Sequence, residues 1–188
     1  MCCRCYVEYL KDKELKKIYD LVSDKEGIKT EGELFPGDNL VIVAKGRNHN
    51  ISAFKMKWGY TFNEILVFNA RSETLYEKEV FLDGIKNRRC VIPVNCYFEW
   101  KKDSKEKYVF KDKESSILFI LGIYRFENGA PVFTILTKDA SKRLSDIHER
   151  MPVMVKNSEV RKWLTMSSDA SSIIKNSVND LYFEPYKK

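Results

Sequence analysis

The sequence SILFILGIYRFENGAPVFTILT, residues 116–137, predicts a long β-hairpin and with it a fold rich in strands. Apolar and aromatic residues fill both halves of this stretch. Asn128-Gly129 stands between the halves, and this pair is typical of a tight hairpin turn. We therefore expect strands at 116–126 and 131–137. The apolar run within the stretch is far too short to cross a membrane as a helix.

Further elements are expected on both sides of this hairpin. Apolar and aromatic runs predict strands at 1–8, 40–44, 54–60, 90–94, 97–101, 108–110 and 151–155, and an aromatic strand near the C-terminal end. Helical spacing predicts helices at 10–22, where Asp12 is the N-cap, at 75–86, 140–147 and 158–164, and once more before the last strand. The polar residues 26–37 predict a loop. This pattern predicts one α+β domain over residues 1–188, built on a curved, mostly antiparallel sheet or barrel with flanking helices.

Composition and charge narrow the classes of function. The chain has 188 residues, 44% of them hydrophobic, and a net charge of +6. Residues 86–113 hold nine Lys and Arg against four Asp and Glu, which places +5 of that charge in one segment. Such a segment is either a solvated hairpin or a footprint for a polyanion whose binding weakens steeply with salt. Neither a membrane span nor a secretory signal is evident, and the odd number of five cysteines favours the reducing cytoplasm.

The cysteines fit poorly with a metal site. Zinc sites usually pair cysteines two to four residues apart with a second such pair or with two histidines. Cys90 and Cys96 are six positions apart, so no metal and no cofactor is expected. We interpret Cys3 and Cys5, together with Cys90 and Cys96, as small core residues. Cys2 differs, because its backbone nitrogen becomes a free amine if the initiator methionine is removed.

Three polar clusters interrupt the apolar pattern. Residues 69–74 read Asn-Ala-Arg-Ser-Glu-Thr, and a capping box from Ser72 or Thr74 would account for part of this segment only. Glu99 lies within an aromatic strand, where it either faces water or, if it faces inward, has a pKa raised towards neutrality. His148 lies between a predicted helix and a predicted strand. From these patterns alone the function stays open between a cysteine-dependent enzyme and a nucleic-acid-binding module.

Five motifs in order carry a resemblance to a known family. They are Met1-Cys2, Asn-Ala-Arg-Ser-Glu-Thr at 69–74, Arg-Cys-Val-Ile-Pro at 89–93, Tyr-Phe-Glu-Trp at 97–100 and His-Glu-Arg-Met-Pro-Val at 148–153. The set resembles the SRAP (SOS response-associated peptidase) family, whose members shield abasic sites in DNA. Two stretches depart from the family pattern: Cys3 and Cys5 replace a glycine and an aromatic residue, and Tyr60-Thr61-Phe62 replaces Leu, Ile or Val, and Pro.

The resemblance implies a covalent chemistry at the N-terminus. After removal of Met1, the α-amine of Cys2 would form a Schiff base with the ring-opened sugar of an abasic site, and the thiol would close a thiazolidine ring. It also implies that Glu99 acts as the general acid/base, that His148 is a second proton-transfer group, and that Asn69 orients Cys2 or the sugar. The sequence leaves open whether removal of Met1 is autocatalytic or the work of an aminopeptidase.

The resemblance further implies a DNA-binding surface. Arg71 and Arg150 would hold the flanking phosphates, with Arg4 as a further candidate. Trp58 and the pair Phe35-Pro36 would stack on bases beside the lesion. For Trp58, packing in the core is the alternative.

The expected partner is single-stranded DNA with abasic sites, including DNA at a replication fork. We expect a monomer that is cytoplasmic and is associated with the nucleoid when bound to DNA. Two alternatives remain open: a cysteine peptidase that acts on other proteins, and a noncovalent module that binds single-stranded nucleic acid.

Overall fold

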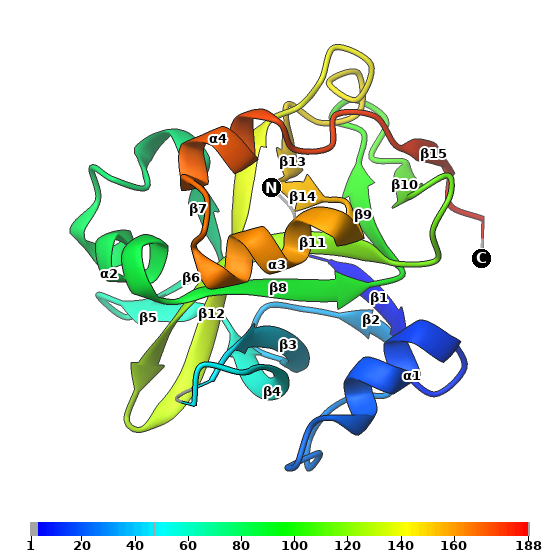
Figure 1. Cartoon of the computed structure of the whole chain (residues 1–188). Coiled ribbons are helices and arrows are strands. Elements are labelled where there is room, and N and C mark those ends of the chain that lie inside the picture. Colours follow the sequence, from blue (N-terminus) through cyan, green and yellow to red (C-terminus); the bar gives the residue numbers. More distant parts are fainter. Residues whose placement is uncertain (1–3, 47, 188) are drawn as a thin grey trace.

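A closed ring of five strands forms the centre of the molecule. The computed structural model describes residues 4–46 and 48–187. The ring runs β12, β4, β3, β8, β11 and back to β12, and all of its pairings are antiparallel except the one between β4 and β12 (Figure 1). The bounds of these strands are β3 Asn39–Lys45, β4 Ile51–Trp58, β8 Arg89–Val94, β11 Leu118–Glu127 and β12 Ala130–Asp139.

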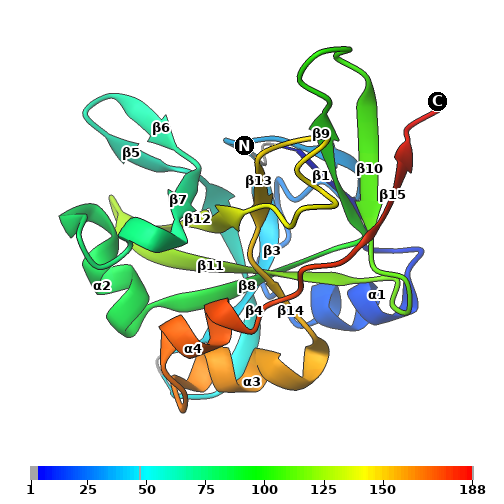
Figure 2. The same cartoon turned by 90° about the horizontal axis from the view of Figure 1, so that it is seen from above.

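Three short strands extend the ring. β7 pairs with β12 in parallel, β13 pairs with β12, and β14 pairs with β11. Their bounds are β7 Asn69–Arg71, β13 Arg150–Pro152 and β14 Met154–Val155. A separate hairpin of β5 Tyr60–Phe62 and β6 Ile65–Val67 projects from the body next to β7 (Figure 2).

A second sheet packs against the ring. Its order is β15-β10-β9-β1-β2, and all of its pairings are antiparallel. The bounds are β1 Cys5–Glu8, β2 Glu31–Leu34, β9 Cys96–Trp100, β10 Lys107–Lys111 and β15 Tyr182–Pro185. Cys5, Tyr97 and Phe110 of this sheet share one buried cluster with Leu40 and Phe133 of the ring. One face of the second sheet therefore belongs to the core, and we call it the inner face.

The helices lie around the two sheets. They are α1 Lys13–Asp20, the 3₁₀ helix η1 Ser72–Thr74, α2 Glu79–Asn87, α3 Asn157–Thr165 and α4 Ala170–Lys175. The Asp12 carboxylate accepts hydrogen bonds from the amides of Glu14 and Leu15, which confirms the predicted N-cap. α2 starts four residues later than predicted, and its N-cap, Lys78, makes no side-chain capping bond, so the predicted capping box is wrong.

The predicted long hairpin is confirmed. β11 and β12 pair from Gly122–Ile135 to Glu127–Ala130. Asn128 and Gly129 both have positive φ, 50° and 81°, as a type I′ turn requires. The fold class, α+β with mostly antiparallel sheets and flanking helices, is confirmed as well.

Two segments differ from the prediction. Residues 31–34 form a strand instead of the predicted loop. This strand lies at the edge of the second sheet and pairs only with β1, and such an edge position tolerates polar side chains. Residues 140–147 form successive turns and no helix, since the segment must reverse direction to bring Arg150 opposite Asp139. The predicted strand at 151–155 is divided in two at Val153.

Candidate functional site

Glu99 is buried on the inner face of the second sheet. It shares this face with Tyr97, two residues earlier on β9, whose ring stacks on Phe110 with centroids 4.7 Å apart. Glu99 itself is 3% exposed. Burial penalises its charged form and raises its pKa to about 7. The inward alternative of the sequence prediction therefore holds, and the carboxyl group can give or take a proton at neutral pH.

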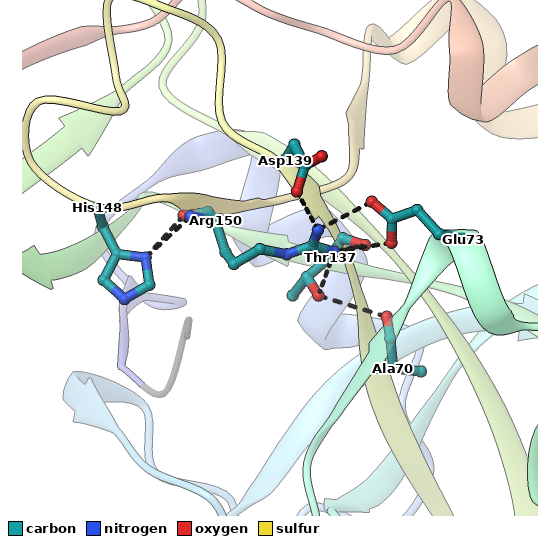
Figure 3. Close-up of polar contacts among 6 residues, drawn as sticks. All are labelled: Ala70, Glu73, Thr137, Asp139, His148 and Arg150. Carbon is teal, nitrogen blue, oxygen red and sulfur yellow. Dashed lines mark hydrogen bonds and ion pairs between the residues drawn. The ribbon is translucent and has the colours of Figure 1, made fainter.

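The backbone of Arg150, two residues after His148 in the chain, holds the imidazole ring of His148. Its Nδ1 lies 3.0 Å from the Arg150 amide nitrogen and 3.1 Å from the Arg150 carbonyl oxygen, so it accepts from the first when unprotonated and donates to the second when protonated (Figure 3). In the neutral ring, the nitrogen that carries the proton decides which of these two contacts is the hydrogen bond. Partial burial lowers the pKa of His148, which favours this neutral form. The backbone of Arg150 therefore fixes the ring through Nδ1 and leaves Nε2 as the nitrogen that can exchange a proton or a hydrogen bond with a substrate.

Arg150 has a structural role in a network of ion pairs and hydrogen bonds, and its role at a DNA phosphate stays a prediction. Its guanidinium is buried and donates two parallel hydrogen bonds to Glu73, at 2.8 and 2.9 Å (Figure 3). It also donates to Asp139 at 2.5 Å and to the Thr137 carbonyl at 2.9 Å. These bonds tie β13, the end of β12 and η1 together, and the same network positions the backbone that holds His148.

Asn69 and Arg71 lie on the same face of β7. Ala70 between them is buried, and the parallel pairing places Asn69 opposite Ile135 and Arg71 opposite Thr137. Asn69 is half-buried and Arg71 is exposed. Their roles in orienting a sugar and in holding a phosphate stay predictions. In both views β13, which begins at Arg150, lies between β7 and β9 (Figures 1 and 2).

Arg4 lies between two aromatic rings. Its guanidinium carbon is 4.3 Å from the centroid of Phe35 and 4.8 Å from that of Trp100. It also forms an ion pair with Glu33. Pro36 is half-buried next to this group. Trp100 belongs to the Tyr-Phe-Glu-Trp motif, yet the sequence alone assigned it no role.

Trp58 is a core residue, and the predicted stacking on DNA bases is wrong. Its side chain has no exposed surface. The indole stacks on Phe133, with centroids 6.2 Å apart, and its Nε1 donates to the carbonyl of Phe68 at 2.9 Å. Both the faces and the polar edge of the ring are thus occupied inside the protein.

The described cysteines are inert core residues. Cys5, Cys90 and Cys96 are free and buried, which confirms the prediction for these three. Burial raises the pKa of Cys96 to about 12 and that of Cys90 well above its usual value. Met1, Cys2 and Cys3 lie outside the described residues. Within residues 4–46 and 48–187, no group of three or more His, Cys, Asp or Glu side chains is arranged to hold a metal ion.

The basic segment 86–113 does not form one uniform surface. Arg89 is buried over Trp163 and donates to the Ile85 carbonyl. Arg88 and Lys113 form ion pairs with acidic residues.

Among the described residues, no helix is both long enough and apolar enough to span a bilayer.

Comparison with known sequences gives a consistent picture. A family model described as "SOS response associated peptidase (SRAP)" matches residues 1–187. The chain is 33% identical over 156 residues to "Abasic site processing protein YoqW" of Bacillus subtilis, covering 71% of this chain and 69% of the relative. It is 29% identical over 171 residues to "Abasic site processing protein HMCES" of Xenopus tropicalis, covering 69% of this chain and 51% of the relative.

Solved structures share the fold. A phage-related protein from Bordetella bronchiseptica superposes with a TM-score of 0.79 at 19% identity, over 100% of this chain and 95% of that chain. A protein from Bacteroides thetaiotaomicron superposes with a TM-score of 0.69 at 22% identity, over 93% and 85% of the two chains. At these identities the likeness concerns the fold alone.

Proposed function

The chain belongs to the SRAP family, and from that premise we propose that it processes abasic sites in DNA. Two of the relatives it matches, from a bacterium and a vertebrate, carry the name abasic site processing protein. We propose further that the reaction is covalent capture by Cys2, that single-stranded DNA is the substrate, including DNA at replication forks, and that the protein acts as a monomer.

Glu99 carries this proposal. Imine chemistry needs a group that both protonates a leaving oxygen and removes a proton at the same pH. A carboxyl group with a pKa of about 7 is half protonated near neutrality, so it can do both. Other acidic residues on the second sheet, such as Glu31 and Glu33, form ion pairs instead.

The proposed reaction starts at the free α-amine of Cys2. An α-amine has a pKa of about 7.7–8.0, so a useful fraction is uncharged at neutral pH. Its lone pair attacks the aldehyde carbon of the ring-opened sugar, and protonation by Glu99 lets the oxygen leave as water to give an imine. The thiol sulfur then adds to the imine carbon while its proton moves to the nitrogen, which closes a thiazolidine ring without any oxidant.

The remaining residues have supporting roles in this proposal. His148, fixed through Nδ1 by the Arg150 backbone, uses Nε2 to bind the sugar hydroxyl or to assist reversal of the crosslink. Asn69 orients Cys2 or the sugar, and exposed Arg71 binds a flanking phosphate. Phe35 with Pro36 provides a surface for stacking beside the lesion. The peptidase activity in the family description corresponds to removal of Met1, without which the Cys2 nitrogen stays in a peptide bond.

The test combines mass measurement with an adduct assay. Intact mass first shows whether Met1 is absent from the purified protein. The Met1-free protein is then incubated with single-stranded DNA that contains one abasic site, and a heat-stable adduct is expected on a denaturing gel. Cys2→Ala should form no adduct, while Cys96→Ala, which removes a buried thiol, should form it as the wild type does.

Three outcomes separate the alternatives. Absence of an adduct from Met1-free protein, beside an active control, would contradict covalent capture. DNA binding that is unchanged by Cys2→Ala, with no adduct in either protein, would instead favour a noncovalent module. Turnover of unrelated peptides by the Met1-free protein would favour a general cysteine peptidase.

A further inference from the structure

The outer face of the second sheet carries a compact group of charges. Side chains alternate between the two faces of a strand, and paired residues share a face. Tyr6 pairs with Glu33 of β2 and with Cys96 of β9, so these three residues lie on the outer face, opposite to Glu99. Lys107 of β10 pairs with Trp100 and lies on the same face. Arg4 contacts both Trp100 and Glu33 there.

One carboxylate lies between two cations at this place. Glu33 Oε2 is 3.4 Å from Arg4 NH1, and Glu33 Oε1 forms an ion pair with the Lys107 ammonium. The Lys29 ammonium donates to the backbone carbonyl of Glu33 at 2.8 Å. The side chain of Glu33 is 25% exposed, that of Arg4 31% and that of Lys107 18%. The group is therefore in reach of solvent, and its cations exceed its carboxylate in charge.

Aromatic rings hold both cations in place. Arg4 is fixed between Phe35 and Trp100, and the Lys107 ammonium lies 3.8 Å from the centroid of Phe98 and 4.5 Å from that of Tyr186. Such contacts restrain side chains that would otherwise be mobile. Arg4 Nε is buried and finds no acceptor among the described residues, so Glu33 satisfies this guanidinium only in part.

We propose that Arg4 and Lys107 form a binding site for one phosphodiester of the DNA, and that the Glu33 carboxylate occupies this site while no DNA is bound. The proposal rests on the proposed function for the identity of the anion. A carboxylate and a phosphodiester each present two oxygens that share one negative charge, and both suit a guanidinium and an ammonium. Glu33 is then an internal competitor, which the DNA backbone displaces.

The energetics allow this exchange. Ion pairs between partly exposed groups contribute little to stability, because solvent screens them. The Arg4–Glu33 contact is also long for a charge-assisted hydrogen bond, which is usually 2.7–2.9 Å. Glu33 therefore lowers the affinity for every DNA strand alike. At an abasic site, the covalent bond to Cys2 retains the DNA in spite of this lower affinity.

The test measures binding of undamaged DNA, where no covalent step takes part. A fluorescent single strand without abasic sites is titrated with wild type and with Glu33→Gln at several salt concentrations. Removing the Glu33 carboxylate adds one net positive charge to the site, and one charge neutralised on a single strand changes log K by about 0.7 per decade of salt. At 50 mM salt, about 1.3 decades below 1 M, Glu33→Gln should bind about eightfold more tightly, and its salt dependence should be steeper by about 0.7.

Two further variants make the test specific. Glu31→Gln changes the net charge equally on the same strand and face, but Glu31 pairs with Lys11. It should change the affinity clearly less than Glu33→Gln does, since the Glu31 carboxylate pairs with Lys11 and not with the two cations of the site. In a Lys107→Met background, the gain from Glu33→Gln should fall to about threefold, half of the effect on the logarithmic scale. Lys107→Met alone should bind more weakly than wild type, and this holds even if Glu33→Gln proves unstable.

Several results would overturn the site. They are a gain from Glu33→Gln no larger than that from Glu31→Gln, a gain unaffected by Lys107→Met, an affinity unaffected by Lys107→Met alone, or no measurable binding by any variant at low salt. The adduct assay tests covalent capture independently of these binding measurements. Binding as expected without an adduct would contradict covalent capture and leave the phosphate site standing, and an adduct with no effect of Glu33 would do the reverse.

Discussion

Replacing Glu99 by glutamine is expected to stabilise the protein at alkaline pH and to leave it nearly unchanged at acidic pH, apart from a constant offset. The two side chains have almost the same shape, but glutamine cannot ionise. Glu99 is buried on the inner face of β9, where ionisation costs free energy that the neutral amide avoids. The difference between the variants therefore depends on pH.

The sign and size follow from the pKa. Burial raises the pKa of Glu99 from 4.5 to about 7, so between these values the folded chain binds a proton that the unfolded chain has lost. The contribution of this group to stability is then fully present below about pH 4.5 and is lost as the pH rises to about 7. At about 1.4 kcal/mol per pH unit, the loss amounts to about 3 kcal/mol.

The assay is urea unfolding of wild type and Glu99→Gln between pH 5 and pH 8.5. Intact mass must show the same N-terminus in both preparations, because a charged amine is part of the electrostatics of the chain. The free energy of unfolding of Glu99→Gln minus that of wild type should rise by up to about 3 kcal/mol across this range and level off above about pH 7.5. Exposed Glu106 provides the control, since Glu106→Gln should follow the wild-type curve.

Parallel curves for wild type and Glu99→Gln would refute the reasoning. They would mean that Glu99 ionises as freely in the folded chain as in the unfolded one. A constant offset between the curves has no bearing on this conclusion, because it reports the hydrogen bonds that differ between a carboxyl and an amide. A difference that falls with pH would mean that a cation stabilises the ionised carboxylate.

Two residues that the family resemblance placed at the DNA-binding surface, Arg150 and Trp58, give further predictions. Arg150→Met should lower the free energy of unfolding by about 1–3 kcal/mol, because it removes the hydrogen bonds of the guanidinium to Glu73 and to the Thr137 carbonyl; unchanged stability would contradict this structural role, and a folded sample with weaker binding of undamaged DNA would support the predicted phosphate contact. Trp58→Ala should cost about 3–5 kcal/mol in urea unfolding, because it leaves a cavity beside Phe133; a loss of DNA affinity without a loss of stability would instead place the indole at the interface.

Much of the fold could be predicted where local signals agree with tertiary packing. The hairpin of β11 and β12 has continuous apolar strands and a turn whose two residues both tolerate positive φ. The hairpin of β5 and β6 makes the same kind of turn with Asn63 and Glu64, at φ values of 48° and 63°, and no glycine marks it. The edge strand β2 was equally hidden, because the polar residues that an exposed edge tolerates are those of a loop.

The site could be predicted only in part, because one sequence does not tell which face of a strand a residue takes. Glu99 could face water or the core with equal support from its pattern, and the pairing of β9 with β1 and β10 decides it. The family resemblance pointed to Trp58 as a residue for DNA, whereas its partner in the core, Phe133, lies 75 positions away along the chain, and the partner that ties Arg150 into the fold, Glu73, lies 77 positions away. Such distant contacts leave no local signal.

The alternation along β9 also explains how Glu99 keeps its pKa near 7 in a chain with a net charge of +6. A guanidinium or ammonium next to a carboxyl group lowers its pKa and can offset the rise that burial causes. Arg4 and Lys107 come close to β9, but they lie on its outer face with Trp100 and are paired with Glu33. Neither cation contributes to the pKa of Glu99, where burial is the main cause. The sheet thus separates the charges suited to binding phosphate from the carboxyl group suited to moving protons, and a β-strand achieves this separation between adjacent residues.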